Sequence, residues 1–177
     1  MQEQGYIPKD LSFDDKAREK LISGISKISN AVKSTLGPQG QTVLIESTEH
    51  TQGLTVTKDG VTVAKSIFLI DPVENLAVRM MKQASEKTAN TAGDGTTTAI
   101  VLTEALVKAG QKYINKGDNT IEIVREIRAA GEKIITKIKS QSVKVTNEML
   151  EDIATISANN DSEIGEIIAK AYKEVGR

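Results

Sequence analysis

The stretch Asn90–Ala99 gathers the residue types that could do chemistry. Two glycines flank Asp94, and the three hydroxyl residues Thr96–Thr98 follow at once. An Asp-Gly pair forms a tight turn in which the backbone can reach positive φ. A helix that begins at such a turn presents unpaired N–H groups and a partial positive charge, both of which suit a phosphate.

Two interpretations of this stretch are open. The threonine hydroxyls could donate to phosphate oxygens while Asp94 holds the magnesium that travels with a nucleotide. Alternatively, the segment is a turn followed by a helix with more capping residues than it needs, because Ser and Thr are helix-start signals. The stretch is not a Walker loop, since no Gly-Lys-Ser/Thr follows the glycines.

Composition narrows the class of protein. The chain has 177 residues with a formal net charge of -1, and 27% of its residues are charged. These values favour one domain or one domain with a small appendage, and they argue against a nucleic-acid scaffold or a polybasic membrane binder. The chain contains 0 cysteines, which excludes disulfides and thiolate chemistry and fits a reducing compartment. No apolar stretch is long enough for a membrane span.

The first half of the chain predicts a helix, a loop and a hairpin. Apolar residues recur at helical spacing over 13–33, with Ser12 as the start signal. Residues 35–40 form a compact loop because Gly37-Pro38 ends the helix. Residues 42–46 and 54–57 predict a β-hairpin that needs a further strand, which a neighbouring subunit could supply. Lys58-Asp59-Gly60 then forms a second carboxylate-bearing turn.

The second half predicts further helices. Asp71-Pro72 marks the start of one that runs to Thr91, with Leu76, Met80, Ala84 and Lys87 on one side and Met80-Met81 expected to fill the core. The helix from Thr96 to about Asn115 is apolar almost all round at first, which predicts a central, buried position. A further helix covers 120–139, and the connector after Ser140 predicts a domain boundary. Two shorter helices follow, at 147–157 and 162–176.

Four motifs in this order resemble a known family. They are Thr35-Leu36-Gly37-Pro38, Thr57-Lys58-Asp59-Gly60-Val61, Ala92-Gly93-Asp94-Gly95-Thr96-Thr97-Thr98-Ala99 and Thr155-Ile156-Ser157-Ala158-Asn159. The set resembles the group I chaperonins, the GroEL family, over nearly the whole chain. The resemblance implies a mainly α fold: the N-terminal part of the equatorial helical bundle over 1–140 with a small β-hairpin, then the first segment of the intermediate domain over 141–177.

The resemblance also implies an ATP-driven protein-folding machine that binds ATP, Mg²⁺ and K⁺. Thr35, Leu36, Gly37 and Pro38 would pack on the nucleotide, and Gly95, Thr96, Thr97 and Thr98 would cradle its phosphates. Asp94 would coordinate Mg²⁺, and Thr35, Lys58 and Thr97 would help to hold K⁺.

The resemblance also implies a catalytic residue. Asp59, followed by Gly60, would face the γ-phosphate and the attacking water in that role. Ile156 and Ser157 would lie near the nucleotide. Phosphoryl transfer depends mainly on positioning and charge neutralisation, which such groups provide. Asp59 and Asp94 as purely structural turn residues remain the alternative.

The implied partners are identical subunits in a double ring, usually heptameric, together with unfolded client proteins and a co-chaperonin. The expected location is the cytoplasm, with an organellar matrix or a viral origin open. Family chains are about three times as long and bind clients through an apical domain, which is absent here. We therefore expect the isolated chain to hydrolyse ATP weakly or not at all. The alternative function is a non-enzymatic short form that co-assembles with intact subunits.

Overall fold

A computed structural model describes residues 11–37, 39–46, 53–115, 117–158 and 160–176. Over these residues the fold is mainly α, with seven helices and one two-stranded antiparallel sheet, which confirms the predicted class. The chain divides into two compact units, Met1–Ile123 and Val124–Arg177, which are described separately below.

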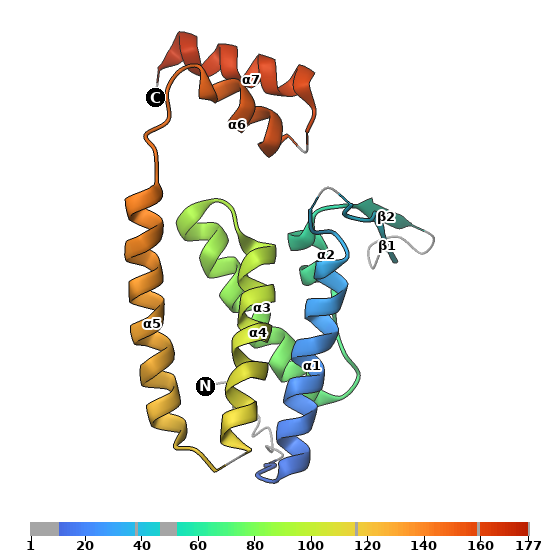
Figure 1. The fold of residues 1–177 in the computed structure, drawn as a ribbon. Helices are drawn as coiled ribbons and strands as arrows, with labels where there is room; N and C mark the ends of the chain where they lie inside the picture. The colour runs from blue at the N-terminus through green and yellow to red at the C-terminus, as the bar shows by residue number, and fades with distance from the viewer. Residues whose placement is uncertain (1–10, 38, 47–52, 116, 159, 177) are drawn as a thin grey trace, which may run out of the picture. The chain divides into compact units, whose positions relative to one another are not determined.

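The first unit contains four helices and the hairpin (Figure 1). Its elements are α1 Asp15–Lys33, β1 Val43–Glu46, β2 Leu54–Thr57, α2 Gly60–Ser66, α3 Pro72–Ala92 and α4 Thr96–Ile114. Helix α2 was not predicted, because seven residues are too few to show a helical period. Figure 1 shows the last turn of α1, helix α2 and the first turn of α4 at the same end of the unit.

Aspartates begin three of these helices. The carboxylate of Asp14 accepts the Ala17 N–H at 2.9 Å, so α1 is capped by Asp14 and the predicted start at Ser12 is wrong. Asp71 caps α3 in the same way, with Pro72 in the first turn as predicted. A carboxylate at this position is favourable because it satisfies free amides and interacts with the positive end of the helix dipole.

The core of the first unit lies between α1, α2, α3 and α4. Its buried apolar residues are Ile28, Val32, Val63, Ala64, Val78, Met81 and Ile100. In α3 the inner side is formed by Ala77, Val78 and Met81, so core filling is confirmed for Met81 and wrong for Met80, which is exposed together with Leu76 and Ala84. Apolar residues lie on both sides of α3, so their spacing alone did not identify the buried one.

Helix α4 is also less buried than its composition predicts. Leu102 and Leu106 are 56% and 50% exposed, while Ile100, Glu104 and Gly110 are its buried residues. The predicted central, fully buried position is thus wrong for the described part of the chain. One side of α4 packs on α1 and α3, and its other apolar side stays uncovered by described residues.

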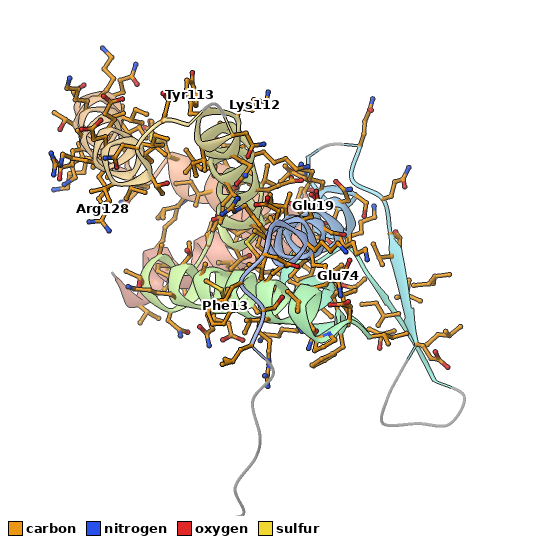
Figure 2. The ribbon with its side chains drawn as sticks, turned by 90° about the horizontal axis from the view of Figure 1, so that it is seen from below. Phe13, Glu19, Glu74, Lys112, Tyr113 and Arg128 are labelled. Atoms are coloured by element: carbon orange, nitrogen blue, oxygen red, sulfur yellow. The ribbon has the colours of Figure 1, made fainter. Side chains whose placement is uncertain are left out.

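Polar contacts join α1 to α3. Lys27 and Ser23 of α1 both donate to the carboxylate of Glu74, at 2.7 and 2.8 Å. Figure 2 views the helices from below and shows Glu74 on the side of α3 that faces α1. A Cβ on Gly24 would overlap the carbonyl oxygen of Glu74, so the backbones approach closely here.

The predicted hairpin is confirmed. Strands β1 and β2 pair antiparallel, with Val43 opposite Thr57 and Glu46 opposite Leu54. Among the described residues the sheet has these two strands only, so a third strand from a neighbouring subunit stays a prediction. Residues 47–52 of the predicted tip lie outside the described residues.

The second unit is made of the greater part of α5, Thr120–Gln141, with α6 Met149–Ser157 and α7 Ser162–Val175. Helices α6 and α7 pack closely, because a Cβ on Gly165 would overlap Thr155 Oγ1 and lie 2.8 Å from the Thr155 Cα. The Asp161 carboxylate accepts the N–H groups of Glu163 and Ile164, and so begins α7. The predicted domain boundary after Ser140 stays a prediction.

Candidate nucleotide-binding site

The first turn of α4 has no side-chain cap. Its N-cap residue is Gly95, at a left-handed φ of 82°, and Gly93 ends α3 at a φ of 73°. Ser85 of α3 is buried and donates to the Thr96 carbonyl at 3.3 Å, which helps to hold the start of α4 in place. The surplus capping of the alternative interpretation is therefore wrong for the described residues: Thr96–Thr98 lie inside the first turn, and no described side chain takes its free amides.

Asp94 lies just outside this helix end. One carboxylate oxygen accepts the Gly95 N–H at 2.5 Å, and the residue is exposed. The carboxylate thus stands beside the amide end of α4 without occupying its first-turn N–H groups. This arrangement can accept an anion at the amides and a cation at the carboxylate.

Gly60 is the point where three of the predicted motifs meet. A Cβ built on Gly60 would overlap Thr97 Oγ1 of α4 and lie 3.2 Å from Thr35 Oγ1, at the end of α1. Only a glycine leaves room for both threonines here. The structure therefore brings Thr35, Gly60 and Thr97 together, although they are far apart in the sequence.

The loop that carries Thr35 is closed back on α1. The Thr35 hydroxyl donates to the Val32 carbonyl at 2.8 Å, and the Gln41 N–H donates to the Ser34 carbonyl at 2.7 Å. Within the loop Leu36 and Gly37 are exposed, and Gly37 has a φ of 80°. Pro38 lies outside the described residues.

Asp59 has a structural task of its own, because it caps α2. Its carboxylate accepts the N–H groups of Val61 and Thr62 at 3.3 and 2.9 Å, and the Thr62 hydroxyl at 2.6 Å. Burial would raise the pKa of Asp59, but these hydrogen bonds outweigh it and lower the pKa below its ordinary value. Asp59 is thus an ionised, firmly held carboxylate. The preceding Lys58 is exposed.

Ile156 and Ser157 belong to the second unit. The Ser157 hydroxyl donates to the Ile153 carbonyl at 2.8 Å, and Ile156 is exposed. Their predicted place near the nucleotide stays a prediction.

Sequence reasoning missed one buried charge in the first unit. Glu104 is 2% exposed, and its carboxylate accepts hydrogen bonds from Lys33 of α1 and Lys108 of α4. The signal was present, because Glu104 is the one acidic residue within the apolar run of 100–107.

The family follows from comparison with known proteins. A model of the TCP-1/cpn60 chaperonin family matches residues 28–177. The chain belongs to this family. Among the solved structures that resemble it is the chaperonin gp146 from bacteriophage EL 2 (Pseudomonas aeruginosa), crystallised in the presence of ATP-BeFx. That structure is 32% identical with a TM-score of 0.77, over 89% of this chain and 28% of that chain.

A second crystal form of gp146 is 29% identical, with a TM-score of 0.74, over 90% of this chain and 28% of that one. A group III chaperonin in the open state is 26% identical, with a TM-score of 0.74, over 90% of this chain and 32% of that chain. The chain therefore spans about a third or less of the chaperonins it matches, as an N-terminal portion. The narrower resemblance to group I stays a prediction.

Two further features are absent from the described residues. No helix among them combines the length and the apolar character needed to cross a membrane. They contain no group of three or more His, Cys, Asp or Glu side chains that could hold a metal ion. A nucleotide-borne Mg²⁺ needs no such cage, because it is held by one or two carboxylates together with phosphates and water.

Proposed function

We propose that this chain is the nucleotide-binding and ring-contact part of an ATP-dependent chaperonin that assists protein folding. The observation that carries the proposal is the convergence of Thr35, Gly60 and Thr97 beside the uncapped start of α4. A helix end with free amides and no capping side chain fits a phosphate group. The presence of ATP-BeFx in the gp146 crystals supports a nucleotide as the ligand of this fold.

Within this proposal the phosphates bind at the amides and hydroxyls of the α4 start, from Gly95 to Thr98. Asp94 stands beside them, where its carboxylate would hold Mg²⁺. Thr35, Lys58 and Thr97 would help to hold K⁺, and Leu36, Gly37 and Pro38 would contact the nucleotide. Magnesium would supply charge neutralisation at the phosphate oxygens.

Asp59 would act in hydrolysis as a carboxylate with a fixed position. The next residue, Gly60, leaves room for Thr35 and Thr97. Because the pKa of Asp59 is lowered, the side chain is a weak base at neutral pH. We infer that Asp59 orients the attacking water and does not by itself remove the proton. This fits the expectation of weak or no hydrolysis by the isolated chain, with further groups needed from outside it.

The wider activity is also part of the proposal. Identical subunits would form a ring, heptameric and doubled, in the cytoplasm, and would act on unfolded clients with a co-chaperonin. The hairpin supports the ring contact, since Leu44, Leu54 and Val56 are exposed on a two-stranded sheet that has free edges. The same surface would let a short, non-enzymatic form co-assemble with intact subunits.

Equilibrium binding tests the proposal. The chain is titrated with ATP and Mg²⁺ by calorimetry, beside an Asp94→Asn variant and a titration without Mg²⁺. We expect magnesium-dependent binding that falls by at least about tenfold in Asp94→Asn, because a magnesium ligand is lost. If Asp94→Asn binds ATP with Mg²⁺ as tightly as the parent chain does, the assignment of the site is refuted.

A further inference from the structure

Glu104 is a buried charge that the proposed nucleotide chemistry does not use. Its carboxylate is 2% exposed and faces two lysines, Lys33 and Lys108, whose side chains are 41% and 47% exposed. Lys33 is the last residue of α1, whereas Lys108 is one turn further along α4 itself. A single group therefore joins the end of α1 to the body of α4.

The carboxylate is charged at neutral pH. Burial would raise its pKa, but the hydrogen bonds from Lys108 and Lys33 outweigh burial and lower the pKa to about 2. A buried charge that loses its donors is strongly unfavourable. The helices must therefore keep a relative position in which Lys33 of α1 still reaches Glu104.

This restraint differs from the apolar contacts beside it. Ile28 and Val32 of α1 share a buried cluster with Ile100 of α4. Apolar burial is non-directional, so these contacts hold the helices together but tolerate small shifts along their axes. Hydrogen bonds to a carboxylate have narrow distance and angle requirements, and setting a register is the best-attested use of buried ion pairs.

Both ends of the restraint lead to the candidate site. Lys33 stands two residues before Thr35, and the Gln41–Ser34 hydrogen bond closes the Thr35 loop onto the end of α1. Thr97 lies seven residues before Glu104, which is two turns back on the same side of α4. A shift of the end of α1 along α4 would thus change the separation of Thr35 and Thr97 on the two sides of Gly60.

We propose that Glu104 is a positioning residue which, through Lys33, sets the place of the Thr35 loop relative to the phosphate-binding start of α4. The proposal rests on the proposed nucleotide site for its functional meaning. The restraint itself is a property of the chain without ligand.

The two lysines provide a matched pair of variants. Lys33→Met removes the donor that crosses between helices, and Lys108→Met removes the donor that stays within α4. Each change takes one half-exposed ammonium from the same carboxylate. Lys33→Arg restores a crossing donor, and Glu104→Gln keeps the size of the side chain without its charge, in case Lys33→Met folds poorly.

The first measurement is hydrogen exchange without nucleotide. The Gly40 and Gln41 amides donate to Gly37 and Ser34 at 2.9 and 2.7 Å, so their protection reports on the closure of the loop. We expect Lys33→Met and Glu104→Gln to speed their exchange by roughly tenfold, since residues that couple sites act at this scale. Lys108→Met should leave these amides within about twofold of the parent, and Lys33→Arg should restore protection.

The second measurement is the affinity for ATP with Mg²⁺. We expect a loss of roughly tenfold in Lys33→Met and Glu104→Gln, with recovery in Lys33→Arg and little change in Lys108→Met. Val78→Ala changes the apolar core without removing a donor from Glu104, and so controls for general destabilisation: it should lower the melting temperature without changing the affinity.

Equal effects of Lys33→Met and Lys108→Met on the loop amides, or no effect of either, would overturn the positioning role. The same holds if Val78→Ala reduces affinity as much as Lys33→Met does. If exchange of the loop amides is faster in Lys33→Met but not in Lys108→Met, and the parent chain binds no nucleotide, the positioning role stands and the proposed function fails.

Discussion

The pairs Asp59-Gly60 and Asp94-Gly95 both lie at the start of a helix, yet they leave the two helices with different ends. Asp59 is itself the N-cap of α2, and its carboxylate takes the first amides. At α4 the glycine is the N-cap, at a φ of 82°, and Asp94 stands one residue outside. A shift of one residue thus decides whether a helix end is closed by its own carboxylate or open to an outside anion. The predictions below test this contrast, from the largest expected effect to the smallest.

Gly60→Ala should have the largest effect. The added Cβ would overlap Thr97 Oγ1, and the branched threonine has little freedom to turn away. We expect a loss of about 1–3 kcal/mol in the free energy of unfolding, together with loss of nucleotide binding. The control is Gly131→Ala, where nothing lies within 4 Å of the added Cβ. That change should be neutral or slightly stabilising in α5, and denaturant unfolding measures both variants.

Asp94→Ala and Asp59→Ala should separate binding from stability. Because Asp94 is the proposed Mg²⁺ ligand, we expect Asp94→Ala to weaken binding of ATP with Mg²⁺ at least tenfold, about 1.4 kcal/mol. The melting temperature should change little, because Asp94 caps no amide in the first turn of α4. Asp59→Ala removes a cap and should cost about 1 kcal/mol in the free energy of unfolding. Calorimetry and thermal unfolding on the same samples would disprove the contrast if both variants behaved alike.

Acid should remove the benefit of the Asp59 cap. The pKa of Asp59 is lowered below its ordinary 3.8 in the folded chain, so its stabilising effect is complete above that value. The effect is lost as the pH falls from 3.8 through the lower folded pKa. The difference in stability between the parent and Asp59→Ala should therefore shrink below pH 3.8, as measured by urea unfolding at several pH values. A difference that stays constant down to pH 2 would show that charge is not involved.

Much of the secondary structure was predictable because its signals are local. Asp71-Pro72 marks the start of α3, and the polar segment between β1 and β2 marks the hairpin. Helix α2 was not predicted because seven residues are too few for a helical pattern of apolar residues to stand out after the turn signal. Met80 was expected to fill the core with Met81 and is exposed, since only the packing of α1 and α4 against α3 decides which side is buried.

The site shows the same limit. The family resemblance implied that Thr35 and Thr97 share one ion site, but their meeting at Gly60 is a tertiary contact that no spacing along the chain encodes. Glu104 is the opposite case, because an acidic residue in an apolar run was visible and its partner Lys33 was not. A buried charge predicts that a partner exists, and only the fold identifies it.

The close approach of Gly165 to Thr155 has a mechanical consequence. Any side chain at position 165 would overlap Thr155 and have to push α7 away from α6. The spacing of the two helices therefore depends on the absence of one methyl group, and Gly165→Ala would act as a wedge that loosens the pair.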